Sequence, residues 1–537
     1  MYLNEASLTA DRAGYAAAGI SLPQYDRAAM IARTTAEPTW LHFGAGNLFR
    51  AFPAKVCDQL LSEGILDHGV IAAEGFDLQI IDDIYAPHDN LSLSVTLLAD
   101  GTVDKQVIGA VAEAVGTDAR GIARLSEIFC APSLQMVSFT ITEKGYAIHR
   151  PDGSIAPAVA SDMSGTPDAA GTFLARLTAL LHKRYLAGAY PLALVSMDNC
   201  SHNGDKLRAA VFTIAQAWAE HGAVSADFPA YLSDESRITF PISMIDKITP
   251  RPDTNVAKML TEVGFADTET VITDKNTYIA PFVNAEKPQY LVIEDKVPAG
   301  RPALDAGGVI FTERTTVDKT EKMKVCTCLN PLHTALAVYG CLLGYTLISA
   351  EMKDPELSAM VHVIGYKEGL PVVVDPGILD PQAFIDEVVG VRLPNPFMPD
   401  APQRIATDTS QKMAVRFGET IKAYLANNMD VTSLRAIPLV IAGWCRYLMG
   451  VDDNGEAFSV SPDPLLSELQ QHLAGLTLGH TCPECVHRAL APILSNASIF
   501  AVDLYQAGLG ETVEALFLAL TEGPGAVRAV LRKTFSA

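Results

Sequence analysis

A short stretch at residues 321–333 gathers side chains that can move protons at a carbonyl group. Its sequence is Glu-Lys-Met-Lys-Val-Cys-Thr-Cys-Leu-Asn-Pro-Leu-His. A lysine ammonium that is partly desolvated has a lowered pKa and can serve as general acid and base near neutral pH. An amide such as that of Asn330 can hold the oxygen of a ketone or an alkoxide. These residue types therefore predict proton transfer at a carbonyl.

The end of this stretch has the spacing of a helix. Asn330 and His333 stand three residues apart, so on a helix they share one face. Apolar surface for burial would come from Leu329, Leu332, Leu336 and Leu343. The same residues also fit a capped helix with a solvated, lysine-rich start and a core histidine, and the stretch alone leaves both interpretations open.

A strand, a glycine turn and a helix are predicted over residues 40–61. Trp40-Leu-His-Phe43 has the pattern of a short buried strand, and Gly44-Ala-Gly46-Asn-Leu-Phe-Arg50 opens a helix that we expect to reach Leu61. In a dinucleotide-binding unit, such glycines let the backbone approach the pyrophosphate at the helix N-terminus. The third glycine of the usual fingerprint is missing and Arg50 stands near its place, so this signal is weak by itself.

An acidic residue follows the next predicted strand. Residues 69–74 are apolar until they end in Glu74, which we predict to bind the adenosine ribose, with Asp77 as the alternative. An acid at this place favours NAD over NADP because it repels the 2′-phosphate. A loop carboxylate without a ligand is the other interpretation.

Polar residues also follow two later strand-like runs. Residues 134–142 lead into Glu143-Lys144-Gly145-Tyr146, and residues 191–196 lead into Asp198-Asn199. Open parallel sheets bind ligands beyond the carboxyl ends of their strands. Beyond residue 313 the pattern becomes helical. We therefore expect an α/β protein with a helical N-terminal extension (1–35), a Rossmann-type dinucleotide-binding domain (36–310) and a mostly α-helical substrate-binding and catalytic domain (311–537).

Charge and hydropathy exclude several classes of partner. The 40 basic and 62 acidic residues give a net charge of -22, which argues against nucleic acid or an anionic membrane surface as a partner. No apolar run reaches the roughly 18 residues of a membrane span, and the N-terminus lacks a signal-peptide pattern. We expect a cytoplasmic protein that acts on a small molecule, and the sequence makes no prediction of its oligomeric state.

The cysteines are scattered and odd in number, with nine in the chain, so we expect reduced thiols rather than disulfides. One segment, His480-Thr-Cys-Pro-Glu-Cys-Val-His487, has metal-ligand spacing. Zinc, a redox pair and a plain loop are its alternatives. The plain loop is favoured because a structural zinc site usually joins two separated ligand pairs, so no metal is expected.

Six different motifs follow one another along the chain, and together they carry a family resemblance. They are Gly44-x-Gly46-x-x-x-Arg50, Thr140-x-Thr-Glu-Lys-Gly-Tyr146, Asp198-Asn-x-x-x-Asn-Gly204, Asp246-Lys-Ile-Thr-Pro250, Asn330-x-x-His333 and Arg404-Ile-Ala-x-Asp-x-Ser-x-Lys412. With them the chain resembles the polyol-specific long-chain dehydrogenases, or mannitol dehydrogenase family, from about residue 38 to the C-terminus.

The resemblance implies metal-independent hydride transfer between NAD and a secondary alcohol or ketone, in a cleft between a Rossmann-type and a helical domain. Carried over by motif, the catalytic residues are Lys324 as general acid and base, Asn199 and Asn330 on the reacting oxygen, and His333 on the neighbouring hydroxyl. The predicted substrate contacts are Asp246, Arg404 and Lys412. The predicted cofactor contacts are Gly44, Gly46, Asn47, Arg50, Glu74 and Thr142. For Asn199 and Asp246, turn capping is the alternative, and for Arg404 and Lys412 it is a solvated basic pair.

The position of the lysine departs from the family pattern by one residue. Family members place it five residues before the asparagine, where this chain has Val325, whereas Lys324 lies six before Asn330. Glu321 precedes Lys324 by the family's spacing of three, which favours Lys324 over Lys322. A single inserted residue near Cys326-Thr-Cys328 would then be absorbed as a π-bulge.

Within the family, the resemblance favours members that reduce keto-sugar acids, and D-fructuronate, reduced to D-mannonate with NADH, is the expected substrate. Its carboxylate would need local cations, for which Arg404, Lys412, Lys247 and Arg251 are candidates. The alternatives are fructose and mannitol as the substrate pair, tagaturonate, or a nucleotide-binding protein without turnover.

Overall fold

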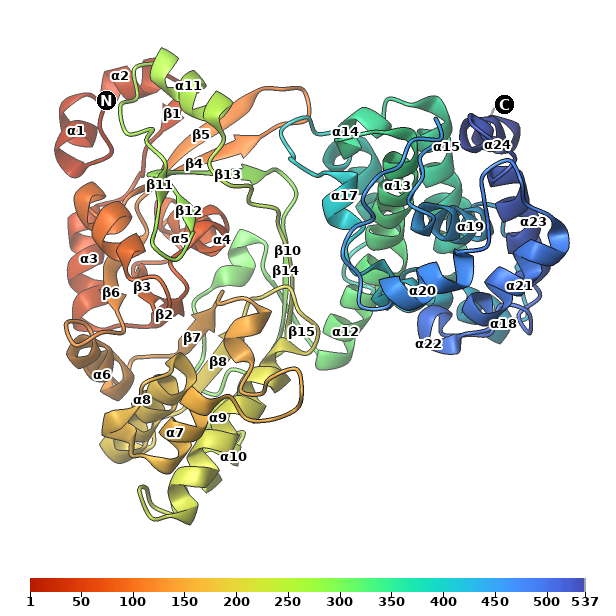
Figure 1. The fold of residues 1–537 in the computed structure, drawn as a ribbon. Helices are drawn as coiled ribbons and strands as arrows, with labels where there is room; N and C mark the ends of the chain where they lie inside the picture. The colour runs from red at the N-terminus through yellow and green to blue at the C-terminus, as the bar shows by residue number, and fades with distance from the viewer. Residues whose placement is uncertain (536–537) are drawn as a thin grey trace. The chain divides into compact units, whose positions relative to one another are not determined.

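The computed structural model describes residues 1–535, which form two compact units (Figure 1). The first unit comprises residues 1–98 and 102–317, and the second comprises residues 99–101 and those from 318 onward. Each unit is described by itself.

A parallel six-stranded sheet forms the centre of the first unit, in the spatial order β6-β3-β2-β7-β8-β9. Its strands are Trp40–Phe43 (β2), Val70–Glu74 (β3), Val111–Gly116 (β6), Met136–Phe139 (β7), Leu192–Ser196 (β8) and Ile238–Thr239 (β9). Every residue of β2, β3, β7 and β8 is buried, as expected for strands that are covered on both faces. This order is that of a doubly wound dinucleotide-binding sheet.

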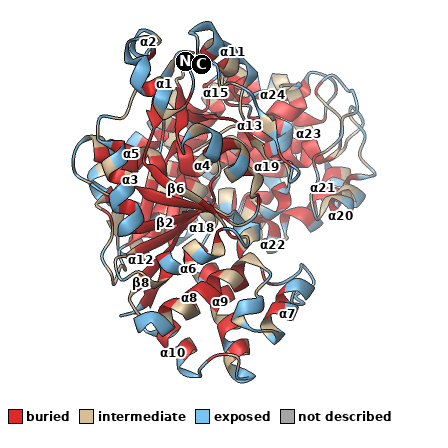
Figure 2. Ribbon diagram, turned by 90° about the vertical axis from the view of Figure 1, so that its left-hand side faces the viewer, coloured by how far each residue is buried: buried red, intermediate tan, exposed pale blue. Residues whose placement is uncertain are grey.

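Helices cover both faces of this sheet (Figure 2). Side chains alternate along β2, so that Phe43 packs in one core and Trp40 in the other. The first core is covered by Ile122–Cys130 (α6), Pro157–Ser164 (α7), Phe173–Gly188 (α8), Asn203–Glu220 (α9) and Asp227–Ser233 (α10). The second is covered by Arg27–Ala36 (α3), Asn47–Ala51 (α4) and Pro53–Ser62 (α5).

The helix expected after the glycine turn is divided in two. It breaks at Phe52, whose φ is -131° and ψ is -77°. Pro53 explains the break, because a proline disfavours helical backbone at the residue before it and starts a new helix well.

Smaller elements complete the first unit. Residues Glu5–Ala10 (α1) and Arg12–Ala17 (α2) precede Ile20–Ser21 (β1), which joins a sheet of order β1-β5-β4-β13. The other strands are Ser92–Leu97 (β4), Val103–Ile108 (β5), Ser243–Asp246 (β10), Val271–Ile272 (β11), Tyr278–Ile279 (β12), Phe282–Glu286 (β13), Tyr290–Glu294 (β14) and Ile310–Thr312 (β15). The remaining helices are Ile81–Tyr85 (η1), Ala86–His88 (η2), Glu143–Tyr146 (η3), Pro167–Ala169 (η4), Thr254–Glu262 (α11) and Leu304–Gly307 (η5).

The second unit is helical, and α12 (Arg314–Lys322) leads into it. The α-helices that follow are Asn330–Leu343 (α13), Ile348–Glu351 (α14), Pro355–His362 (α15), Pro381–Glu387 (α16), Pro402–Ile405 (α17), Glu419–Ala426 (α18), Ala436–Leu448 (α19), Leu466–Leu473 (α20), Pro483–Leu494 (α21), Ala497–Phe500 (α22), Gly510–Leu520 (α23) and Ala526–Phe535 (α24). Four π-helical segments occur among them: Met323–Cys328 (η6), Val363–Gly369 (η7), Val388–Arg392 (η9) and Ala414–Gly418 (η11). The short 3-10 helices are Leu370–Val372 (η8), Thr409–Gln411 (η10) and Val431–Ser433 (η12).

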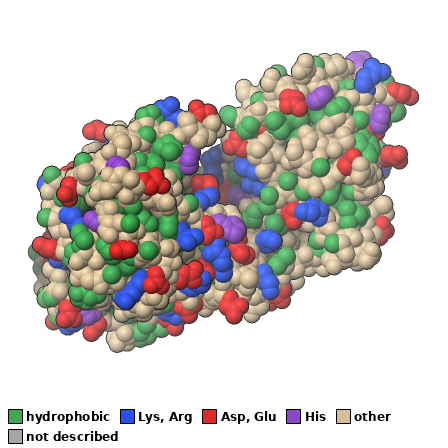
Figure 3. Space-filling model, turned by 90° about the horizontal axis from the view of Figure 1, so that it is seen from below, with side chains coloured by type: hydrophobic (Ala, Val, Ile, Leu, Met, Phe, Trp, Pro, Cys, Tyr) green, Lys and Arg blue, Asp and Glu red, His purple; other side chains and the backbone are tan. Residues whose placement is uncertain are grey.

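One helical run, Arg314–Leu343, has the length and apolar composition of a membrane-spanning helix. However, 78% of its most apolar window is buried inside the fold, as in the core helix of a folded domain. On the surface shown in Figure 3, Lys and Arg side chains lie among Asp and Glu side chains, in keeping with a chain of net charge -22.

Candidate active site

The glycine turn after β2 is shaped by close contact with its neighbour. Gly44 has a φ of +106°, and a Cβ at this position would lie 2.2 Å from the carbonyl oxygen of Thr140. Only glycine fits both the backbone conformation and the space. By contrast, a Cβ on Gly46 would have no atom within 4 Å, so the backbone of this part of the turn is open to a ligand.

Glu74 connects the end of β3 to this turn. It is buried, and its Oε2 accepts a hydrogen bond from the N–H of Ala45 at 2.9 Å. Its Oε1 accepts from the N–H groups of Phe76 at 2.8 Å and Asp77 at 3.1 Å. Glu74, the residue predicted to bind the ribose, therefore also fixes the glycine turn. The alternative, Asp77, accepts a hydrogen bond from the hydroxyl of Thr273.

Asn47 and Arg50 bond to the protein's own oxygens. Arg50 is fully buried, and it donates to the carbonyl of Ala280 at 2.7 Å and to Oδ1 of Asn47 at 2.8 Å. Burial lowers the pKa of its guanidinium. Arg50 thus joins α4 to the segment between β12 and β13 by a hydrogen bond. Its contact with a cofactor stays a prediction.

Thr142 lies next to the glycine turn, because β7 pairs with β2. Its φ of 66° is unusual for a residue with a branched side chain. The carboxylate of Asp198 accepts hydrogen bonds from the N–H groups of Ile141 at 2.9 Å and Thr142 at 2.8 Å, and one from the hydroxyl of Tyr146 at 2.5 Å. Strained backbone of this kind often occurs at functional sites.

Asn199 and Asp246 lie at the carboxyl ends of strands in two different sheets. Asn199 is exposed directly after Asp198, beyond the carboxyl end of β8. Asp246 is buried at the end of β10, whose first residue, Ser243, donates to the carbonyl of Ser196 at 2.5 Å. The first unit therefore collects Gly44, Gly46, Asn47, Glu74, Thr142 and Asn199 along one edge of the main sheet, where open parallel sheets bind ligands.

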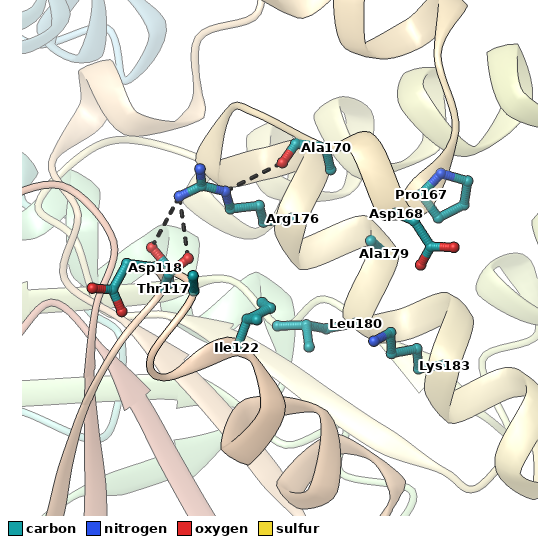
Figure 4. Close-up of a pocket in the computed structure, with 11 residues that line it drawn as sticks. Thr117, Asp118, Ile122, Pro167, Asp168, Ala170, Arg176, Ala179, Leu180 and Lys183 are labelled. Atoms are coloured by element: carbon teal, nitrogen blue, oxygen red, sulfur yellow. Dashed lines mark hydrogen bonds between the residues drawn. The ribbon is translucent and has the colours of Figure 1, made fainter.

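A pocket of about 270 Å³ lies between α6 and α8 (Figure 4). It begins at Thr117, directly after β6, and the N–H of Thr117 donates to the carbonyl of Glu74 at 3.0 Å. Arg176 donates to the carbonyls of Thr117 and Ala170, while Ile122 and Leu180 supply apolar wall. The pocket thus adjoins the carboxyl ends of β3 and β6.

In the second unit, Lys324 is buried in the π-helical segment η6, whereas Lys322 is exposed. The π-bulge predicted near residues 326–328 is confirmed, since η6 spans Met323–Cys328. A π-helical turn contains more residues than an α-helical turn, so η6 accommodates the one residue that this chain has in excess of the family pattern. Asn330 then stands at the first position of α13. Which lysine transfers the proton stays a prediction.

His333 and Arg404 meet at one carboxylate. Nε2 of His333 lies 3.4 Å from Oδ2 of Asp400, and Arg404 forms an ion pair with Oδ1 of the same residue. His333 and Arg404 together hold the pKa of Asp400 below its ordinary value, although burial alone would raise it. Asp400 was not among the predicted site residues, although it lies four residues before Arg404.

Lys412 lies near a second cation, Arg416. Lys412 donates to the carbonyl of Thr407, and its pKa is lowered by burial and by the charge of Arg416. Arg416 donates to the hydroxyl of Thr334, on the helix of Asn330 and His333. Arg416 was not among the predicted site residues, although its spacing of four residues from Lys412 places the two side chains on one helix face.

The two remaining cation candidates for the substrate carboxylate lie in the first unit. Lys247 donates to the carbonyl of Glu286 at 2.5 Å and to Gln289 at 3.1 Å. The guanidinium of Arg251 lies 3.9 Å from the centre of the Tyr278 ring.

The Cys/His segment at 480–487 contains a disulfide between Cys482 and Cys485. The expectation of reduced thiols is therefore wrong for this pair, since two cysteines at the start of α21 lie close enough to bond. His487 contacts Glu514 instead of the cysteines. Among residues 1–535, no group of three or more His, Cys, Asp or Glu side chains is arranged to hold a metal ion.

Comparison with known proteins identifies the family. A family model described as the mannitol dehydrogenase Rossmann domain matches residues 38–306, and one described as the mannitol dehydrogenase C-terminal domain matches residues 316–519. The chain belongs to the mannitol dehydrogenase family. The resemblance inferred from the motifs is confirmed, as is the fold class of a Rossmann-type unit followed by a largely helical one.

Individual relatives match over the whole length. A D-mannonate oxidoreductase of Thermotoga maritima is 49% identical and covers 99% of both chains. Among solved structures, the mannitol 2-dehydrogenase of Pseudomonas fluorescens, in a ternary complex with NAD and D-mannitol, has a TM-score of 0.69 at 26% identity, over 99% of both chains. A substrate-free D-sorbitol dehydrogenase shares the fold, with a TM-score of 0.79 at 24% identity, over 99% of this chain and 100% of that one.

Proposed function

We propose that this mannitol dehydrogenase family member interconverts D-fructuronate and D-mannonate, with Lys324 as general acid and base. It is an oxidoreductase whose cofactor is NAD, in line with its family and with the NAD complex of the Pseudomonas fluorescens relative. The observation that carries the choice of substrate is the 49% identity, over 99% of both chains, to a protein named D-mannonate oxidoreductase.

The first unit fits a dinucleotide. The open backbone at Gly46 leaves room for a pyrophosphate, and Glu74 borders the position of a ribose. The pocket beside Thr117 has suitable walls for adenine, because it combines the apolar side chains of Ile122 and Leu180 with polar groups directly after β6. When bound, NADH supplies the hydride to the carbonyl carbon.

The protein's own groups handle the oxygen and the proton. In the reductive direction, Lys324 gives a proton to the ketone oxygen, and in the oxidative direction it removes the proton from the alcohol. The amides of Asn199 and Asn330 donate hydrogen bonds to this oxygen, and each fixed donor contributes on the order of 3 kcal/mol as negative charge develops. His333, oriented by Asp400, holds the neighbouring hydroxyl. Asp246 binds further hydroxyls, while Arg404 and Lys412 bind the far end of the substrate.

A substrate screen tests this proposal. Purified protein is mixed with NADH and, in parallel, with D-fructuronate, D-tagaturonate or D-fructose, and NADH oxidation is followed by absorbance. We expect the highest rate with fructuronate. Turnover of fructose alone would favour mannitol 2-dehydrogenase activity, the second candidate, which the likeness to the Pseudomonas fluorescens enzyme supports.

A further inference from the structure

Arg416 is a largely desolvated cation without an acidic partner. Its guanidinium donates a hydrogen bond to Oγ1 of Thr334, and it forms no ion pair with any carboxylate of residues 1–535. Burial lowers its pKa to about 10. A guanidinium taken out of water is costly unless a negative charge accompanies it.

The acidic groups nearby are already engaged. Asp400 is shared by Arg404 and His333. Asp463 accepts hydrogen bonds from the N–H and hydroxyl groups of Ser410 at 2.8 and 2.5 Å. Lys412, the closest cation in sequence, is half-buried and has a carbonyl oxygen rather than a carboxylate as its partner. Asp408 and Asp463 lie close enough to interact with the charge of Lys412. No carboxylate acts on Arg416 in this way, so among the described residues its charge is left to be neutralised by something outside the chain.

The cations lie close to the predicted catalytic residues of the same unit. Thr334, which accepts from Arg416, itself donates to the carbonyl of Asn330 at 2.9 Å. The segment η11, which contains Arg416, packs against both α13 and η6, the elements of His333 and Lys324. An anion held by Arg416 would thus lie in the same part of the second unit as the groups that we assign to proton transfer.

The chemistry of the guanidinium favours a carboxylate as this anion. Its planar array of N–H donors matches the two oxygens of a carboxylate, which a neutral polyol does not provide. In fructuronate the carboxylate stands at the opposite end of the carbon chain from the reacting ketone. The carboxylate can therefore be bound at Arg416 while the ketone reacts near Asn330.

We propose that Arg416, assisted by Lys412, binds the carboxylate of the substrate and so makes this enzyme prefer sugar acids to neutral sugars. This inference rests on the proposed function, because it assumes that the reacting sugar occupies the second unit near Asn330. It makes Arg416, which no motif singled out, the main determinant of the preference for acids, with Lys412 in an assisting role.

Binding measurements test this assignment without turnover. In the presence of NADH, which cannot accept a hydride, D-mannonate and D-mannitol are titrated calorimetrically into wild-type protein and into Arg416→Gln, Arg416→Lys and Arg488→Gln. Arg488 is an exposed arginine of α21 and serves as the matched control. We expect Arg416→Gln to weaken mannonate binding at least tenfold and to leave mannitol binding unchanged. Arg416→Lys should retain part of the affinity, and Arg488→Gln should match the wild type.

Other outcomes would overturn the assignment. Equal losses for mannonate and mannitol would mean that Arg416 only positions Asn330 through Thr334, and unchanged mannonate affinity would mean that the carboxylate binds elsewhere. Kinetics separate this failure from that of the proposed function. If the wild type reduces fructuronate but Arg416→Gln keeps its KM, only the role of Arg416 is wrong, whereas a wild type that does not reduce fructuronate contradicts the proposed function itself. Arg416→Lys keeps the test decisive should Arg416→Gln fail to fold.

Discussion

Glu74 accepts a hydrogen bond from the N–H of Ala45 at 2.9 Å, and this contact joins the loop after β3 to the glycine turn after β2. The carboxylate that is expected to face the ribose thus also shapes the turn at which we expect the pyrophosphate. One side chain thus holds both halves of the proposed nucleotide site in place, so we expect substitutions in this turn to change cofactor affinity.

The two glycines of the turn should respond differently to alanine. Gly46→Ala adds a methyl group where no protein atom lies within 4 Å, so stability should be preserved while NADH affinity falls about fivefold or more. Gly44→Ala places a methyl group 2.2 Å from the Thr140 carbonyl, so both stability and affinity should fall. Fluorescence titration with NADH and urea unfolding measure the two effects. Full NADH affinity in Gly46→Ala would show that the cofactor does not approach this backbone.

Replacing Lys324 should abolish chemistry but not cofactor binding. Lys324→Ala removes the proposed proton donor, and we expect kcat for fructuronate to fall by about a hundredfold or more, with NADH affinity within twofold of the wild type. Lys322→Ala is the matched control, because Lys322 is exposed two residues earlier. Collapse of turnover in Lys322→Ala, with activity kept in Lys324→Ala, would reverse the choice of lysine.

The pocket between α6 and α8 can be filled to test its assignment to adenine. Ile122 lines the pocket, and Ile122→Trp should raise the KM for NADH several-fold with little change in the KM for the sugar. A tryptophan at an exposed position of α9, Ala209→Trp, controls for a general effect of the added ring. An unchanged KM for NADH in Ile122→Trp, together with a melting temperature like that of the wild type, would place the adenine elsewhere.

Glu351 should make the protein less stable as the pH rises. It is fully buried, neither carboxyl oxygen has a hydrogen-bond partner among the described residues, and burial raises its pKa to about 9. Between its unfolded pKa near 4.5 and about 9, the folded state binds more protons than the unfolded state, so the free energy of unfolding falls with rising pH.

Glu351→Gln removes this titration and keeps the shape of the side chain. We expect the variant to match the wild type at pH 5 and to exceed it by about 4 kcal/mol at pH 8 in urea unfolding. A difference that is the same at both pH values would show that Glu351 does not titrate in this range.

The sequence predicted the elements whose residues follow a local pattern. The buried strand at Trp40–Phe43 was expected from its apolar run and the turn from its glycine spacing. The π-bulge at 323–328 was expected because the chain has one residue more than the family pattern between the lysine and Asn330. The expected continuous helix to Leu61 was wrong because Pro53 disfavours helical backbone at Phe52 and the helix breaks there.

Contacts between distant segments could not be predicted in this way. The pairing of Asp198 with Thr142 and that of Arg416 with Thr334 bridge 56 and 82 residues, respectively, and no spacing rule connects them. Arg50 illustrates the same point. It stands at the place of a fingerprint glycine, but its guanidinium is bound to Ala280, which lies 230 residues further along the chain.

The most direct test of the central claim is the ratio of kcat/KM for D-fructuronate to that for D-fructose, measured by NADH oxidation on the wild-type protein, with the product identified by chromatography. The proposed function predicts a ratio of about a hundred or more, since a site that binds a carboxylate discriminates strongly against a neutral analogue, and it predicts D-mannonate as the product. A ratio near or below one, with mannitol formed from fructose, would contradict it.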